Sequence, residues 1–123
     1  MPAPTQSVAV VGLGSMGLGM ARALLRNGHT VRGFDVNRAA LDSLSEAGGI
    51  ACASPADAAR GSDVAVVVVV NAAQTQAVLF GEGGMAAALA PGSVILACAT
   101  IAPAEAKEFA RRAGEDGILY IDG

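Results

Sequence analysis

The sequence is poor in the residues that build nucleic-acid-binding surfaces. Its 123 residues include no tryptophan, one tyrosine and three phenylalanines, and only eight are lysine or arginine. The formal net charge is −3. Proteins that bind nucleic acid present clustered positive charge, and those that bind single strands add aromatic side chains on which bases stack. The composition therefore argues against a nucleic-acid partner.

Cysteines and long apolar runs are also scarce. The two cysteines, Cys52 and Cys98, make neither a disulfide framework nor a metal site, and the opening letters MPAPTQ do not resemble a signal peptide. We therefore expect reduced thiols and a cytoplasmic protein. The longest unbroken apolar run, residues 64–70, is much shorter than the ~20 residues of a membrane-spanning helix, so we expect no membrane partner.

Small apolar residues are abundant instead. Hydrophobic residues make up 53% of the chain and charged residues 15%, so a substantial core is available. Because aromatic residues make up only 3%, alanine, valine and leucine must fill that core, which suits helices packed closely on a parallel sheet. The length fits one domain. We assign residues 1–6 to a loose N-terminal segment and residues 7–123 to the domain.

Short β-branched runs alternate with segments of helical pattern along the chain. Five consecutive valines begin at Val66, and a strand that is apolar on both faces belongs in the centre of a parallel sheet. We expect strands at residues 7–12, 29–35, 50–52, 64–70, 93–97 and 118–121, and helices at 15–27, 38–47, between 54 and 61, 75–80, 85–89 and 104–113. This alternation predicts an α/β fold, a Rossmann-type doubly wound parallel sheet of about six strands with helices on both faces and strand order 3-2-1-4-5-6.

Residues 7–35 carry the most specific pattern in the chain. An apolar run ends at Val11 and meets the G-x-G-x-x-G sequence GLGSMG, which a helical segment and a second strand follow. In this setting the first glycine allows a sharp turn, the second lets a diphosphate approach the backbone, and the third lets the helix pack closely on the sheet. The N–H groups at the helix start would face the phosphates. We therefore predict a dinucleotide site at Gly12, Leu13, Gly14, Ser15, Met16 and Gly17.

An acidic residue ends the second expected strand. The carboxylate of Asp35 can accept both ribose hydroxyls of NAD and would repel the 2′-phosphate of NADP, although Arg38 is close enough in sequence to contact such a phosphate. We therefore predict NAD as the cofactor, with NADP as the less favoured alternative. Val36 and Asn37 continue the same loop and join the predicted site, and Asn37 is also expected to cap the next helix.

Doubly wound sheets bind their ligands at the carboxyl ends of the strands, where the strand order reverses. We therefore expect residues 12–17, 70–75 and 98–103 to face one crevice. Cys98 falls at this end of the sheet, but no histidine is placed to activate its thiol, because the single histidine, His29, falls at the opposite end. We expect neither residue to take part in chemistry.

Several further motifs place this pattern in a known family. The elbow GLGSMG with GMARALLRNGHTVRGFD, ASPADAA at 53–59, FGEGG at 80–84, LAPG at 89–92, ATIAP at 99–103 and YIDG at 120–123 together resemble the β-hydroxyacid dehydrogenases. The resemblance covers essentially the whole chain, and VNAAQ at 70–74 is most similar to the threonate dehydrogenase branch. It implies the NAD-binding half of an oxidoreductase that transfers hydride between nicotinamide and a small β-hydroxy acid, such as 3-hydroxyisobutyrate or threonate.

The resemblance also implies roles for residues outside the elbow. Val69 and Val70 match a Leu-Pro pair that lines the cofactor in the family. Gln74 matches a polar contact to NAD, and Thr100 matches the residue that touches the nicotinamide. The residue before that threonine is usually a substrate-binding serine and is Ala99 here, which leaves the usual substrate contact unsupported at this position.

The family's general acid/base lysine lies in a helix that follows this domain. The one lysine of the chain, Lys107, falls among charged residues on a face typical of solvent exposure, so we predict no catalytic residue here and no activity of the chain alone. A helical catalytic domain would follow in the intact enzyme, and an apolar patch left near the C-terminus would favour a homo-oligomer. The alternative is a non-catalytic nucleotide-sensing or interaction module with the same fold.

Overall fold

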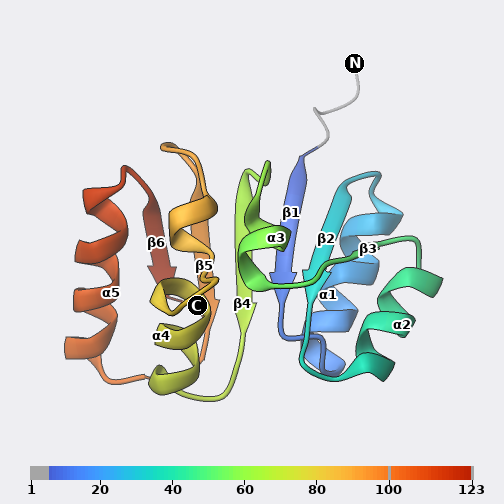
Figure 1. Ribbon diagram of the computed structural model, residues 1–123, viewed down its shortest axis with the longest axis horizontal. Coiled ribbons are helices and arrows are strands. Elements are labelled where there is room, and N and C mark those ends of the chain that lie inside the picture. The colour runs from blue at the N-terminus through green and yellow to red at the C-terminus, as the bar shows by residue number, and fades with distance from the viewer. Residues whose placement is uncertain (1–5, 100, 123) are drawn as a thin grey trace.

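The computed structural model describes residues 6–99 and 101–122, in which strands and helices alternate as the sequence predicts (Figure 1). The predicted nicotinamide contact, Thr100, lies outside the described residues. The elements are β1 (Ser7–Val11), α1 (Ser15–Arg26), β2 (Thr30–Phe34), α2 (Arg38–Glu46), β3 (Ile50–Ala51), α3 (Pro55–Ala59), β4 (Val64–Val68), α4 (Ala72–Phe80), the 3₁₀ turn η1 (Ala86–Ala88), β5 (Val94–Cys98), α5 (Pro103–Glu115) and β6 (Leu119–Asp122).

The six strands form one parallel sheet in the order β3-β2-β1-β4-β5-β6, which confirms the predicted topology (Figure 1). β1 lies between β2 and β4, and its last residue, Val11, is level with Phe34 on one side and Val67 on the other. The segments that follow these three strands therefore leave the sheet at the same edge. This is the point where the strand order reverses.

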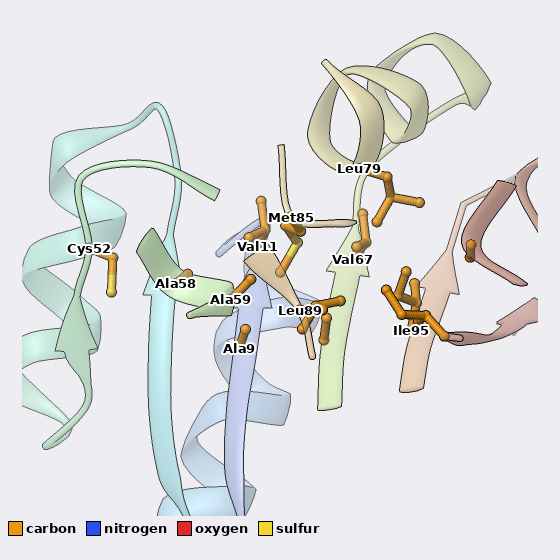
Figure 2. Close-up of a cluster of buried hydrophobic side chains, with 13 residues drawn as sticks. Ala9, Val11, Cys52, Ala58, Ala59, Val67, Leu79, Met85, Leu89 and Ile95 are labelled. Atoms are coloured by element: carbon orange, nitrogen blue, oxygen red, sulfur yellow. The ribbon is translucent and has the colours of Figure 1, made fainter. Parts of the chain in front are cut away.

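The sheet is buried on both faces around β1 and β4, which explains the apolar runs in their sequences. Val8 and Val10 of β1 belong to a core cluster with side chains of α1 and α2. Ala9 and Val11 belong to a second cluster, which side chains of α3 and α4 complete on the opposite face (Figure 2). Small alanines of α3, such as Ala58, let that short helix lie close to the strands.

The valine run forms a shorter strand than predicted. β4 ends at Val68, and Val69 and Val70 leave the sheet. The Val70 N–H donates to Gln74 Oε1 at 2.8 Å, because the chain already turns here into α4. Asn71 Oδ1 accepts the Gln74 N–H at 2.9 Å and caps the helix, so α4 begins at Ala72, earlier than predicted. The cap overrides the β-preference of the last two valines.

The predicted helix at residues 85–89 is also wrong, because only the 3₁₀ turn η1 forms there. The Met85 N–H donates to the Val78 carbonyl at 2.8 Å, and the Met85 side chain is fully buried in the core (Figure 2). This segment is therefore a packed connection between α4 and β5. The other predicted boundaries shift by a few residues, as helix and strand ends commonly do.

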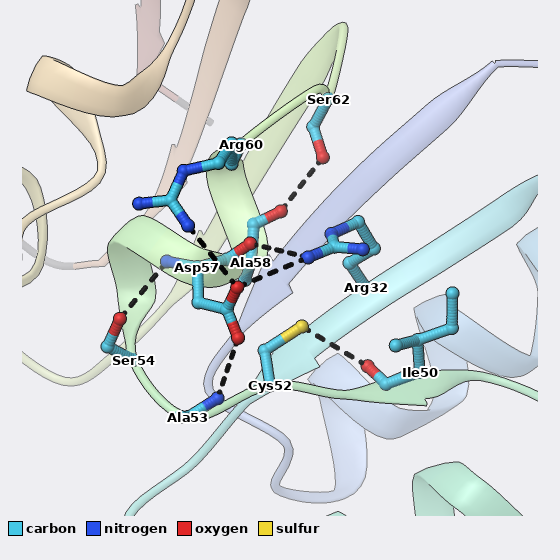
Figure 3. Close-up of polar contacts among 9 residues, drawn as sticks. All are labelled: Arg32, Ile50, Cys52, Ala53, Ser54, Asp57, Ala58, Arg60 and Ser62. Carbon is cyan, nitrogen blue, oxygen red and sulfur yellow. Dashed lines mark hydrogen bonds and ion pairs between the residues drawn. The ribbon is translucent and has the colours of Figure 1, made fainter.

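A polar cluster joins β2 to α3 (Figure 3). Arg32 Nη2 donates to the Asp57 backbone carbonyl at 2.8 Å and lies 3.4 Å from the Asp57 carboxylate. The pair is partly exposed, so it contributes at most about 1 kcal/mol and mainly orients α3. Burial raises the pKa of the neighbouring Cys52 thiol, which fits a small core residue rather than a reactive thiolate.

The β6 end of the sheet exposes apolar side chains, as expected near the C-terminus. Leu119 is 59% exposed and Ile121 is 43% exposed. Tyr120 alternates with them along the strand and packs edge-on against Phe109 of α5, so the two exposed residues point to the other face. None of the helices in the described part of the chain has the length and apolarity that crossing a bilayer requires.

Candidate functional site

Two glycines shape the elbow between β1 and α1. Gly12 has a φ of 98°, and a Cβ at this position would lie 1.9 Å from the Val68 carbonyl oxygen. A Cβ on Gly17 would lie 1.8 Å from the Gly12 carbonyl oxygen, so α1 approaches the elbow at a distance that only glycine permits. A Cβ on Gly14, in contrast, would meet nothing within 4 Å. Gly14 therefore leaves open space in front of the elbow.

α1 begins at this open space with an uncapped N-terminus. Gly14 is the N-cap, and no side chain accepts a hydrogen bond from the first turn of α1 within the described residues. The helices α2, α3 and α4 are capped by the side chains of Asn37, Ser54 and Asn71. The first N–H groups of α1 are thus left for an external acceptor, and the helix dipole adds positive potential at the same place. Such a terminus suits a phosphate.

Asp35 lies beside the elbow, at the carboxyl end of β2. Its Oδ2 accepts the Leu13 N–H at 2.7 Å, and its Oδ1 accepts the Asn37 N–H at 2.8 Å. The Leu13 side chain is only 2% exposed and packs in the core. Both the backbone N–H and the side chain of Leu13 therefore make contacts within the protein. Asn37 Oδ1 accepts the Ala39 N–H at 2.9 Å, as expected of a cap. Each carboxylate oxygen of Asp35 has a further lone pair for a hydroxyl.

A cavity of about 340 Å³ lies between the elbow, the end of β2 and the start of α4. This volume falls within the range of small-molecule sites. Residues that the sequence analysis predicted for the site line the cavity, namely Gly12, Asp35, Val36, Val69, Val70 and Gln74. The segments after β1, β2 and β4 therefore meet around one cavity.

Apolar side chains from two loops lie at the opening of the cavity. Val36 is 93% exposed and Val70 is 72% exposed, although both are aliphatic. Exposed valines on two loops around one cavity offer surface to a flat apolar ring. Gln74 Oε1 accepts the Val70 N–H, so this amide side chain is held at the cavity and also closes the loop before α4.

Five further lining residues, Val11, Phe34, Val68, Ala77 and Val78, were not predicted as site residues from the sequence. Ala77 and Val78 lie one helical turn beyond Gln74, so the i, i+3 and i, i+4 spacing of α4 could have identified them. Phe34 directly precedes Asp35, and alternation along β2 would have placed its side chain on the opposite face from that of Asp35.

The remaining candidate side chains lie as the sequence analysis expected. Cys98 ends β5 in register with Val68, so the segment after β5 leaves the sheet at the edge where the cavity lies. His29 precedes β2 at the opposite edge, where its Nδ1 accepts the Gln6 N–H at 3.1 Å. Lys107 is exposed on α5.

Residues 7–123 match the family model described as the NAD binding domain of 6-phosphogluconate dehydrogenase. The chain belongs to this family. The match includes the uncapped α1, the elbow and Asp35, and it confirms the prediction of an NAD-binding domain and of NAD as the cofactor.

Known relatives extend well beyond this NAD-binding domain. The chain is 45% identical over 118 residues to L-threonate dehydrogenase of Cupriavidus necator, and the match covers 96% of the chain and 40% of the relative. It is 35% identical over 117 residues to NAD-dependent L-serine dehydrogenase of Pseudomonas aeruginosa, covering 95% of the chain and 39% of the relative. The domain thus spans about two fifths of the length of these relatives.

A solved dehydrogenase structure has the same fold as this chain. The structure of 3-hydroxyisobutyrate dehydrogenase from Salmonella typhimurium aligns with a TM-score of 0.88 at 40% identity, covering 94% of this chain and 40% of that chain. The predicted resemblance to β-hydroxyacid dehydrogenases is therefore confirmed by both sequence and fold.

Proposed function

We propose that this NAD-binding domain holds and orients NAD in a longer dehydrogenase that oxidises a small β-hydroxy acid. One observation carries the proposal: the open space at Gly14 lies before the uncapped N-terminus of α1 and beside Asp35. The names of the relatives, L-threonate dehydrogenase and 3-hydroxyisobutyrate dehydrogenase, support the substrate class. When bound, NAD would supply the hydride acceptor, and the protein would supply position.

Three places in and beside the cavity suit three parts of NAD. The diphosphate would lie over Gly14 and accept the N–H groups of Ser15 and Met16. The ribose hydroxyls would donate to the lone pairs that Asp35 has left, and a 2′-phosphate would meet its negative charge. The adenine would rest on Val36 and Val70. The domain would therefore prefer NADH to NADPH.

We further propose that no side chain of this domain transfers the substrate proton. Lys107 is exposed on α5, His29 lies at the far edge of the sheet, and no base is predicted to activate Cys98. The proton transfer would belong to a lysine in the remainder of a longer enzyme, as the family resemblance implies. The domain alone should therefore bind NADH without turning over a hydroxy acid.

Replacement of Gly14 by alanine tests the placement of the diphosphate. Gly14 has an ordinary extended backbone with φ −70° and ψ −170°, and a Cβ there meets no protein atom within 4 Å, so Gly14→Ala should fold normally. The methyl group would occupy the path of the diphosphate. We expect NADH affinity, measured by fluorescence titration, to fall about tenfold or more, equivalent to at least ~1.4 kcal/mol.

Gly19→Ala is the matched control. Gly19 lies in α1 and is exposed, and a Cβ there also meets nothing within 4 Å, but the position is beyond the first turn. This variant should bind NADH as the unmodified domain does. Equal affinities of the Gly14 and Gly19 variants would contradict the placement of the diphosphate, and failure of the unmodified domain to bind NADH would contradict the proposed function itself.

A further inference from the structure

Asp35 joins two loops of the cavity. One carboxylate oxygen accepts the Leu13 N–H of the elbow at 2.7 Å, and the other accepts the Asn37 N–H before α2 at 2.8 Å. Hydrogen bonds to an ionised acceptor are shorter and about twice as strong as neutral ones. The side chain is half-buried, which limits competition from water.

The bond to Leu13 is one of two that attach the elbow to β2. The Gly12 N–H donates to the Phe34 carbonyl at 3.0 Å, which is a contact between backbones. The Leu13 N–H donates to the Asp35 side chain, and the Leu13 side chain is anchored separately in the core. Gly14 follows directly. Asp35 is therefore the side chain that holds the elbow just before the place where a diphosphate would lie.

We infer that Asp35 is a positioning residue for the diphosphate part of the site, besides its proposed contact with the ribose. The inference rests on the proposed function. Without this carboxylate, the Leu13 and Asn37 N–H groups lose their acceptor, and the elbow loses its side-chain attachment to β2. The N–H groups at the start of α1 then lose their fixed place relative to the cavity.

A positioning role for Asp35 and a ribose contact alone predict different effects of its removal on NADH and NADPH binding. If Asp35 acted only on the ribose, its removal would weaken NADH binding and relax the discrimination against NADPH. A positioning role predicts that both coenzymes bind more weakly. Loss of a negative charge near a diphosphate would by itself strengthen binding, so a weaker interaction would report the loss of position.

The test uses 2′,3′-dideoxy-ADP, which has a diphosphate but no ribose hydroxyl. Its affinity is measured by NMR titration for the unmodified domain, Asp35→Ala and Asp35→Asn, beside the affinities for NADH and NADPH. Amide hydrogen exchange of Leu13 is followed in the ligand-free proteins. Asp42→Ala is the matched control, because Asp42 lies nearby on α2 with its side chain 65% exposed and 3.7 Å from Arg38.

We expect Asp35→Ala to bind 2′,3′-dideoxy-ADP about tenfold more weakly, as the loss of a charge-assisted hydrogen bond would give. NADH should lose more, because its ribose contact is lost as well, and NADPH should lose less, because the repulsion of its 2′-phosphate is relieved. Leu13 amide exchange should become faster. Asp35→Asn should show an intermediate loss, because its amide oxygen can replace one acceptor while its NH₂ group faces the other donor. Asp42→Ala should leave the affinities for NADH and 2′,3′-dideoxy-ADP and the Leu13 exchange rate unchanged.

Unchanged binding of 2′,3′-dideoxy-ADP and unchanged Leu13 exchange in the Asp35 variants would overturn the inference and leave a ribose contact only. If the unmodified domain binds none of the probes, the proposed function fails, but Leu13 exchange still decides whether Asp35 holds the elbow. If Asp35→Ala does not fold, Asp35→Asn supports or overturns the inference by the same comparison.

Discussion

At the scale of single residues, the three glycines of the elbow are not equivalent. A side chain on Gly12 or Gly17 would collide with backbone, whereas one on Gly14 would meet only open space. Gly12 and Gly17 therefore determine whether the elbow can form, and Gly14 determines whether a ligand can approach it. Substitutions at Gly14 and Gly17 should separate binding from stability.

Gly17→Ala should destabilise the domain. Its Cβ would lie 1.8 Å from the Gly12 carbonyl oxygen, so α1 or the elbow would have to move. We expect the free energy of unfolding, measured in urea, to fall by about 3 kcal/mol, at the upper end of typical overpacking costs. Gly19→Ala should raise it by up to about 1 kcal/mol, because alanine favours the helix. Equal stability of the two variants would contradict the close approach of α1.

The glycine roles could be predicted from sequence because each follows from the absence of a Cβ at a known place in the motif. The bond between Asp35 and the Leu13 N–H could not, because it depends on the direction of a backbone amide after a turn with positive φ. The sequence therefore predicts a ribose contact for Asp35 and a cofactor contact for Leu13, with no link between the two residues.

At the scale of elements, side-chain caps mark where α2, α3 and α4 begin. Asn71 caps α4, whose first turn carries Gln74 and forms a wall of the cavity. Ser54 caps α3 in the same way, by accepting the Asp57 N–H at 3.0 Å, but α3 does not line the cavity. The two caps are alike in chemistry and differ in their distance from the site.

Asn71→Ala and Ser54→Ala should therefore separate stability from binding. Each should lower the free energy of unfolding by about 1 kcal/mol, the usual cost of losing an N-cap. Only Asn71→Ala should also weaken NADH binding, because its cap holds the segment that carries Val70 and Gln74. Calorimetric titration and urea unfolding of both variants measure this. Equal NADH affinity in both would show that the start of α4 does not shape the cavity.

The same caps explain which element boundaries sequence reasoning could reach. Asn37 stands before a clear helical pattern, and its cap was predicted. Val69 and Val70 extend a β-branched run, and local preference favours a continued strand there. The Asn71 cap and the Val70 N–H bond to Gln74 reverse that preference, and such competition between neighbouring segments is not visible in composition or periodicity.

At the scale of the whole molecule, the strand order places the site. β1 lies between β2 and β4, so the segments after these three strands converge on one cavity even though they are far apart in sequence. The alternation of strands and helices was sufficient to predict this order, because right-handed crossovers leave few other arrangements. A ligand in the cavity would contact both halves of the sheet.

Ligand binding should therefore stabilise the domain as a unit. A ligand that binds only the folded state at a hundred times its dissociation constant adds about 2.7 kcal/mol, which for a domain of this size raises the melting temperature on the order of 10 °C. NADH should produce this shift and NADPH a smaller one at the same concentration, because of the charge on Asp35. Gly14→Ala should reduce the shift to about half at the same NADH concentration, because a tenfold weaker affinity leaves about 1.4 kcal/mol of stabilisation, while Gly19→Ala should preserve the full shift. A melting temperature that does not change with NADH concentration would show that the open space before α1 is not a binding site, whatever its shape.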